Sequence, residues 1–487
     1  MADRSGQSRA GCGGGHIPGG EASPAHGHLR AEATDPGAPR RGRPRQHGAE
    51  RSWVYAFANR AAGRAHAPVV GNVRSSTLRD RQLWIHSTRL HVVLYALLLI
   101  ATPFLLLQNF LVELIGAVST YHTTVGGLRL PVVPAIAGTI ALGLVVWFRQ
   151  RIRRRHLVAA AVVVLMDAAA QQVTDYYFAH NFYDLQQNWH YIAYGLFGFF
   201  LYRDLRPRGT PLARIILLTA GIALGLSSFD ELFQMRISRR VFDVGDISKD
   251  LWGTLMGMVL IYVGGPGLDE LRRAGWRLRH ARARDYLQQP LALLAWLIIW
   301  GFVFVCISAL LTEVEYLWVA VTLTVGICVA LFLIVHASQF RRVRYVLVTL
   351  AVAAAGTQAY FAYRYRGTGI TYAARNLTVY AGVPLPVFDW LFFADGSFRP
   401  VDKKHLFNNR DQRTLLLHRP DILVIGAGFE GRGGHGFPEK SPCFFIYNPF
   451  LGRGTQVVIL PTPQACELFN RLRREHRNAL FVLHSGC

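Results

Sequence analysis

Long apolar segments dominate this sequence and limit the folds that are open to it. A helix that crosses a bilayer needs about 20 predominantly apolar residues, and this chain of 487 residues repeats such segments between residues 90 and 363. Its hydrophobic fraction is 51% and its mean hydropathy is +0.22. We therefore predict a mainly α-helical fold, a polytopic transmembrane helical bundle of about nine spans with a small C-terminal α/β domain. The predicted spans are 90–110, 131–148, 156–174, 189–203, 212–229, 247–264, 290–311, 315–336 and 344–363.

The positive charge follows a pattern found in membrane proteins. A formal net charge of +23 would indicate a nucleic-acid partner in a soluble protein, but most arginines lie in the N-terminal tail and in alternate connections between apolar segments. Cytoplasmic loops carry such an excess of Lys and Arg. We predict a multi-pass protein of the cell membrane with a cytoplasmic N-terminus and no nucleic-acid partner. Nine spans place the C-terminus outside, although Arg364 and Arg366 after the last span favour the cytoplasm.

Composition divides the chain into five regions. Residues 1–85 are rich in Gly, Ala, Pro, Arg and His and lack apolar periodicity, which is typical of disorder. The segment 268–286 is basic with interspersed Leu and one Trp, which indicates an amphipathic stretch on the inner leaflet. The predicted regions are a disordered basic tail (1–85), an N-terminal transmembrane hairpin (86–155), a transmembrane core (156–265), the amphipathic segment with additional transmembrane helices (266–364) and a soluble α/β domain (365–487).

The transmembrane core contains one strongly polar stretch, residues 228–257, between two apolar segments. Ionisable groups near bilayer depth are costly, so they indicate a functional site that faces protein or water. Asp246, Asp250, Gly253 and Gly257 follow the spacing i, i+4, i+7, i+11 and share one helix face. Because glycines let a second helix approach closely, we expect both carboxylates at a helix interface near the third or fourth span. A short hydrated loop with ordinary helix caps is the alternative.

Two neighbouring spans add polar stripes of their own. The third span carries three polar residues at i, i+4 and i+8, and the fourth carries a histidine and a tyrosine one turn apart. Three helices with polar faces favour a shared, outward-facing cavity over separately paired side chains. We also expect Arg240 to pair with a carboxylate at Asp230–Glu231. The predicted site residues are Asp167, Gln171, Asp175, His190, Tyr194, Asp230, Glu231, Gln234, Arg240, Asp246 and Asp250, with Gly253 and Gly257 in helix packing.

These residues resemble the signature of the VanZ family of small integral membrane proteins. The resemblance covers roughly 158–263, and Gln187 stands where that family usually has a lysine. It implies a VanZ-like core that acts at the cell envelope and lowers sensitivity to lipoglycopeptide antibiotics, with membrane lipids or a lipid-linked envelope precursor as partners. The matching positions are Asp230, Glu231, Gln234, Arg240, Asp246, Asp250, Gly253 and Gly257, preceded by His190, Tyr194 and Gly195.

The C-terminal region alternates short apolar runs with one helical pattern. DILVIGAG, TQVVILPT and NALFVLH read as strands, and Thr462 as N-cap with Pro463 at the first position opens a helix through about Arg474. GAGFEG matches GxGxxG, but the residues after it are rich in Gly and Pro and form no helix, so we predict no dinucleotide site. The order of these elements resembles a small α/β domain family that includes a mitochondrial complex I assembly factor. That resemblance implies a fold, and a protein partner for the domain.

The chemistry of the site stays open at this stage. The sequence has no GxSxG or HExxH motif, and its six cysteines have no paired spacing, so we expect no metal, no cofactor and no assigned catalytic residue. One alternative is a membrane enzyme that uses Asp230, Glu231 and His190 in acid–base work on a lipid-linked substrate. Another is an assembly scaffold that recruits a partner through its C-terminal domain. Glu313 and Gln358 are isolated polar points without a predicted partner.

Overall fold

A computed structural model describes most of the chain after residue 86. The described ranges are 87–105, 121–125, 128–174, 185–236, 242–265, 282–407, 409–438, 441–448 and 452–486, with the single positions 114, 118 and 268. The predicted disordered tail, most of the amphipathic segment 268–286, Asp175 and Arg240 lie outside these residues. Predictions for them therefore remain untested.

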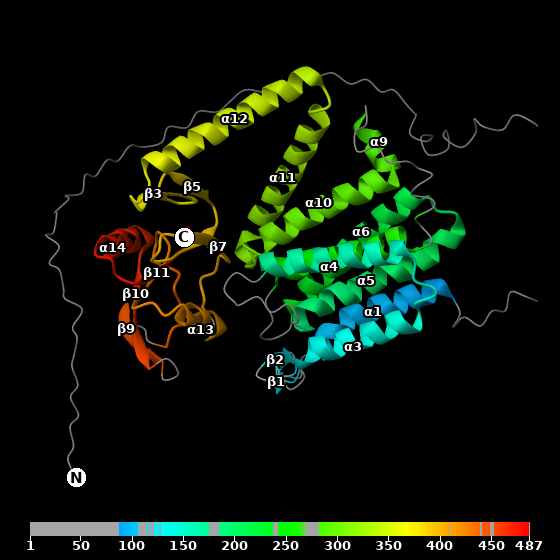
Figure 1. The fold of residues 1–487 in the computed structure, drawn as a ribbon, viewed down its shortest axis with the longest axis horizontal. Helices are drawn as coiled ribbons and strands as arrows, with labels where there is room; N and C mark the ends of the chain where they lie inside the picture. Colours follow the sequence, from blue (N-terminus) through cyan, green and yellow to red (C-terminus); the bar gives the residue numbers. More distant parts are fainter. Residues whose placement is uncertain are drawn as a thin grey trace, which may run out of the picture. The chain divides into compact units, whose positions relative to one another are not determined.

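Each of the nine predicted apolar segments contains a helix (Figure 1). Short elements join them: the hairpin β1 (His122–Val125) and β2 (Leu128–Pro131), the 3-10 helices η2 (Arg206–Arg208) and η4 (Val314–Tyr316), the π-helix η3 (Leu260–Gly264) and α9 (Ala283–Gln288). The long helices are α1 (Thr88–Leu105), α3 (Val132–Trp147), α4 (Arg154–Thr174), α5 (Leu185–Leu205), α6 (Leu212–Gln234), α7 (Val244–Val259), α10 (Pro290–Ser308), α11 (Leu317–Ala337) and α12 (Arg341–Arg364).

Five of the described helices are long and apolar enough to cross a membrane, and the predicted count of nine spans is not supported. Two further apolar helices, Thr88–Thr102 and Ala135–Trp147, are shorter. The segments in α5 and α7 carry charged side chains, and α7 is buried along most of its length. Apolar runs in the sequence thus predicted helices that are buried by other helices as well as helices that are long and apolar enough to cross a membrane. The five spans are Arg154–Val173, Leu212–Gln234, Pro290–Ser308, Val314–Ala337 and Arg341–Arg364.

Helix α7 is the packing centre of the bundle and contacts α4, α5, α6 and α10. Its glycines account for the closeness of the α5 contact. A β-carbon on Gly253 would lie 2.6 Å from Cα of Tyr191, and one on Gly257 would lie 2.8 Å from Cα of Gly195. On another face, Trp252 Nε1 donates a hydrogen bond to the carbonyl oxygen of Met166 in α4, at 3.1 Å. The expected role of both glycines in helix packing agrees with this geometry.

The C-terminal region contains two sheets, in agreement with the predicted α/β domain. The larger has the strand order β7-β6-β11-β8-β10-β9, in which β11, β8 and β10 are parallel and the remaining neighbours are antiparallel. The smaller is the antiparallel sheet β3-β4-β5. The strands are β3 (Ile370–Ala374), β4 (Leu377–Tyr380), β5 (Val383–Pro386), β6 (Asp389–Phe392), β7 (Phe398–Val401), β8 (Ile422–Gly426), β9 (Cys443–Asn448), β10 (Arg453–Leu460) and β11 (Ala479–Leu483).

Two helices, α13 (Asn409–Leu417) and α14 (Thr462–Arg474), accompany these strands. The apolar face of α14, with Ala465, Phe469 and Leu472 at i, i+4 and i+7, packs against β8 and β11. The predicted N-cap is wrong by one residue: Pro461 occupies that position. Instead, Thr462 Oγ1 donates to the carbonyl oxygen of His484, at 2.7 Å, and joins the helix start to the sheet.

Candidate polar site between three helices

Three helices each contribute one side chain to a buried hydrogen-bonded group. Nδ1 of His190 in α5 lies 2.8 Å from Oδ1 of Asp250 in α7. Oγ of Ser227 in α6 donates to Oδ2 of the same carboxylate, at 2.6 Å. Asp250 is 3% exposed and Ser227 is fully buried. Both oxygens of this buried carboxylate are thus satisfied, as a buried charge requires.

A second carboxylate of α7 lies on the other side of the imidazole. Nε2 of His190 lies 3.7 Å from Oδ1 of Asp246, which also accepts from Lys249 Nζ at 2.8 Å. Asp246 and Asp250 are one turn apart, so the predicted shared face is present. The side chains of His190 and Asp246 are 22% and 27% exposed. We call His190, Ser227, Asp246, Lys249 and Asp250 the polar cluster; its accessible part is His190 and Asp246.

The carboxylates at the end of α6 hold the connection to α7. Gln234 Nε2 donates to Glu231 Oε1 at 2.8 Å and to Asp230 Oδ2 at 3.1 Å. Glu231 Oε2 accepts from the backbone N–H of Asp243, at 2.9 Å, and Asp243 Oδ1 caps α7 by accepting from the N–H of Gly245. Glu231 is therefore committed to backbone and amide donors, which fixes where α7 begins.

The predicted stripe on α4 meets α5 at a different point. Gln171 Nε2 donates to Asn188 Oδ1, at 3.2 Å. Oδ1 of Asp167 is buried and has no hydrogen-bond partner among the described residues. Among those residues, no hydrogen bond or ion pair joins either α4 side chain to His190, and the shared, outward-facing cavity stays a prediction. Tyr194 is buried on α5, one turn from His190.

Sequence reasoning missed Ser227, Lys249 and Asn188 as contributors. Ser227 had a usable signal, because Ser227, Glu231 and Gln234 follow i, i+4, i+7 and share the buried face of α6. Asn188 had only its place next to the predicted fourth span, two residues before His190. The close contact between α5 and α7 determines which polar faces of the helices meet. That contact depends on how the two helices pack in space.

The order of the hydrogen bonds limits the chemistry. In a serine nucleophile system, histidine lies between serine and carboxylate and takes the proton of the hydroxyl. Here the carboxylate of Asp250 lies between Ser227 and His190. Ser227 therefore helps to hold Asp250, and Asp250 orients the imidazole. This arrangement suits binding of a polar group, or holding a proton on His190, better than acyl transfer.

Comparisons with known proteins give a limited fold likeness and no family. No family model matches the chain, and no curated protein is significantly similar to it. Two solved structures are similar: MT938, at 19% identity, and a conserved hypothetical protein PH1505 from Pyrococcus horikoshii OT3, at 18% identity. Each likeness covers 24% of this chain and 98% of the other, with a TM-score of 0.20. We base no functional argument on these two likenesses.

Proposed function

We propose that this chain is a VanZ-like integral membrane protein whose polar cluster binds the polar head group of a membrane-embedded ligand at the cell envelope. The observation that carries the proposal is the bonded group of His190, Asp250 and Ser227 at the meeting of α5, α6 and α7. Buried ionisable groups within a helical bundle are costly, and function is the usual reason that they persist. His190 and Asp250 also belong to the positions that resemble the VanZ signature, which supports the same reading.

The cluster divides into a contact part and a support part. His190 and Asp246 are partly accessible, whereas Asp250 and Ser227 are buried beneath them. With His190 protonated, two carboxylates are balanced by the imidazolium and by Lys249. A head group that carries both hydroxyls and charges can exchange hydrogen bonds with His190 and Asp246 without leaving an unpaired buried charge. We assign the ligand contacts to these two residues and a positioning role to Asp250.

We place the polar cluster and the C-terminal domain on the outer side of the membrane, with the N-terminus in the cytoplasm. The alternating arginine-rich connections support this orientation. The C-terminal domain contacts the loop before α11, since the N–H of Lys403 donates to the carbonyl oxygen of Leu310 at 3.0 Å. Two helices, α11 and α12, lie between that loop and the C-terminal domain in sequence. If both helices cross the membrane, the loop and the domain are on the same side of it.

The experiment is expression in a bacterial host that is sensitive to a lipoglycopeptide antibiotic. The full chain should raise the inhibitory concentration of the antibiotic, and the variants His190→Gln and Asp250→Asn should lose that effect at equal abundance in the membrane. Asp285→Asn, a matched change of an exposed carboxylate outside the cluster, should behave as the parent chain does. Unchanged sensitivity on expression of the parent chain, or full activity of Asp250→Asn, would contradict the proposal.

The alternative of a membrane enzyme has less support. Its acid–base set was Asp230, Glu231 and His190, but Glu231 accepts from Gln234 and from the backbone of Asp243. His190 is bonded to Asp250 instead. Glu231 therefore holds the connection between α6 and α7, Asp230 accepts from Gln234 within α6, and the histidine belongs to a different group.

A further inference from the structure

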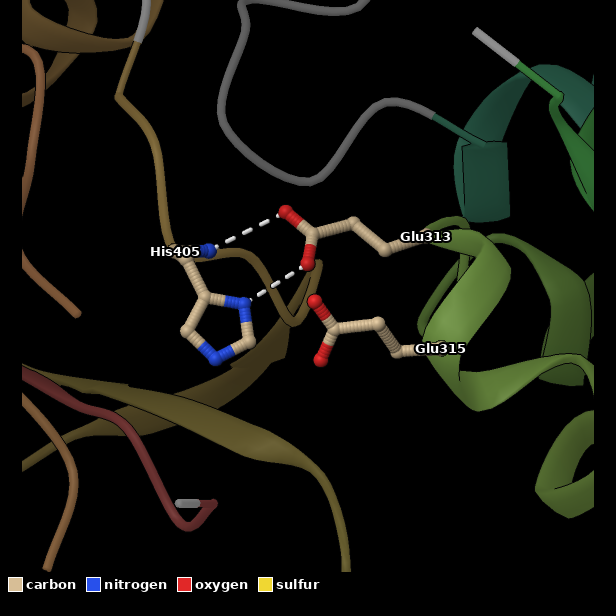
Figure 2. A group of neighbouring side chains, drawn as sticks. All are labelled: Glu313, Glu315 and His405. Carbon is tan, nitrogen blue, oxygen red and sulfur yellow. Dashed lines mark hydrogen bonds and ion pairs between the residues drawn. The ribbon is translucent and has the colours of Figure 1, made fainter. Parts of the chain in front are cut away.

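A second group of ionisable side chains lies where the C-terminal domain meets the loop between α10 and α11. Glu313 and Glu315 come from that loop, and His405 comes from the segment that follows β7 (Figure 2). One ligand atom from each of the three lies within 4.8 Å of the others. In the part of the chain that the structure describes, no other group of three or more His, Cys, Asp or Glu side chains meets this condition.

One backbone and one side-chain hydrogen bond between other residues hold the two segments together. The N–H of Lys403 donates to the carbonyl oxygen of Leu310 at 3.0 Å, and Thr312 Oγ1 donates to Asp402 Oδ1 at 2.8 Å. Glu313 is the N-cap residue of η4, which places Glu315 two residues further on the same turn. The three donors are therefore brought together by contacts that do not involve their own side chains, which is the preorganisation that a binding site needs.

Among the described residues, the negative charge of the two carboxylates is not balanced by a Lys or Arg. Glu313 accepts from the backbone N–H of His405 at 3.1 Å and lies 2.8 Å from its Nδ1. Within the described residues, no Lys or Arg forms an ion pair with Glu313 or Glu315. The two nearby lysines bond elsewhere: Lys403 Nζ donates to Val387 O and Ser485 Oγ, and Lys404 pairs with Asp402 and Asp411.

The imidazole of His405 is held in place by its neighbours. Its ring stacks on Tyr316, with centroids 6.2 Å apart and an interplanar angle of 11°. The ring of His484 meets it edge-on, with centroids 4.8 Å apart. In Figure 2, the carboxylates of Glu313 and Glu315 both point toward this ring from the loop before α11. A fixed imidazole beside two carboxylates is a donor set for a metal ion rather than for a large organic ligand.

We propose that Glu313, Glu315 and His405 bind a divalent transition-metal cation, of the type of Zn²⁺ or Mn²⁺, which ties the C-terminal domain to the helical bundle. Imidazole nitrogen and carboxylate oxygen together suit these ions, and three protein ligands leave positions for water. The cation takes the place of the proton between Nδ1 of His405 and Glu313, and the neutral imidazole then carries its proton on Nε2. This site could not be predicted from the sequence, because Glu313 and His405 lie 92 positions apart.

The test is titration of the purified full-length chain, freed of metal and of any affinity tag, with Zn²⁺ and separately with Mn²⁺ by calorimetry. The parent chain should bind one cation per chain in a saturable step that raises its unfolding temperature. His405→Ala and Glu315→Gln should each weaken that step at least ~10-fold. Glu430→Gln, which changes an exposed carboxylate of the same domain, should leave it unchanged.

The readouts separate loss of a ligand from loss of the fold. Glu315 is exposed and has no bonded partner among the described residues, so Glu315→Gln should unfold at the same temperature as the parent chain when no metal is present. Histidines elsewhere in the chain can add weak binding, which His405→Ala would not change. The proposal is overturned if the parent chain shows no saturable step, or if both variants keep it at parent affinity.

Discussion

Gly257 of α7 lies so close to Gly195 of α5 that a β-carbon on Gly257 would be 2.5 Å from the carbonyl oxygen of Gly195. One turn earlier, Gly253 meets the backbone of Tyr191 and His190 in the same way. This close contact makes the polar cluster possible, because the side chains of His190 and Asp250 can bond directly only when the backbones of α5 and α7 are near each other. The site thus depends on two glycines that take no part in its chemistry.

Gly257→Leu should strongly destabilise the bundle. The new side chain would meet backbone atoms of α5, which cannot move aside as a flexible side chain can, so we expect a loss of 3 kcal/mol or more, above the usual cost of about 1–3 kcal/mol for overpacking. Thermal unfolding in detergent micelles measures it. Gly225→Leu in α6 is the matched control, because nothing lies within 4 Å of a β-carbon there. Equal effects of the two changes would contradict the close contact.

Ser227→Ala should destabilise the bundle through Asp250. Removal of the hydroxyl leaves Oδ2 of a buried carboxylate without its donor, a change that costs about 1–3 kcal/mol. Ser228→Ala is the control, since the neighbouring serine is less buried and outside the cluster. Unfolding of both variants by denaturant gives the comparison. A Ser227→Ala variant as stable as the control would show that this hydrogen bond contributes nothing.

The C-terminal domain offers a test of a buried charge. Lys404 pairs with Asp402 and Asp411, of which Asp411 has a fully buried side chain. Lys404→Met should cost about 3–5 kcal/mol, because two carboxylates then lack their cation. Arg375→Met removes an exposed ion pair with Glu430 and should cost less than ~1 kcal/mol. Denaturant titration distinguishes the two; equal losses would mean that burial of the Lys404 group is immaterial.

The loss of stability caused by Lys404→Met should also depend on pH. Burial raises the pKa of Asp402, and Lys404 opposes that rise. When the pKa of a carboxyl group is higher in the folded state than in the unfolded state, folding becomes less favourable as the pH rises. The free energy of unfolding then falls between the unfolded pKa, about 4, and the folded pKa. Without the lysine, the pKa of Asp402 in the folded state rises further. The loss of stability caused by Lys404→Met should therefore be largest at neutral pH and should become smaller as the pH falls toward 4. A deficit that stays constant over this range would exclude the carboxylates as its cause.

Cys466 should be unreactive in the folded domain. It lies on the buried face of α14, and burial raises the pKa of its thiol to about 12. At pH 8 the thiolate fraction is then about one part in 10,000, and the thiolate is the reactive form. In a chain whose other cysteines are replaced, maleimide should label Cys466 only after unfolding. Glu467→Cys, at the exposed neighbouring position, should react at once, and rapid labelling of native Cys466 would contradict its placement.

Much of the helical architecture follows from the sequence because apolar runs of helix length have few alternatives. All nine predicted segments contain helices, and the shared face of Asp246, Asp250 and the two glycines follows from 3.6-residue periodicity. The number of spans does not follow. A run such as 247–264 has the apolar content of a membrane helix, but its burial by neighbouring helices cannot be read from its own residues.

Which helix faces pack against each other could not be predicted from the sequence either. The sequence placed His190 near the polar stretch, but it did not distinguish Asp250 from Glu231 as the partner of His190, since both lie on helices that pack nearby. The contact between Glu313 and His405 is a stronger case. Its two residues come from the loop between α10 and α11 and from the C-terminal domain, and neither belongs to a periodic pattern that would have marked it.

A double-mutant cycle on His190 and Asp250 tests the central claim most directly. The free energy of unfolding is measured for the parent chain, His190→Gln, Asp250→Asn and the double variant. If the imidazole and the carboxylate bond as described, the double variant should lose about 1–3 kcal/mol less than the sum of the single losses, because the shared contact is removed only once. Losses that add within about 0.5 kcal/mol would contradict the polar cluster between α5 and α7.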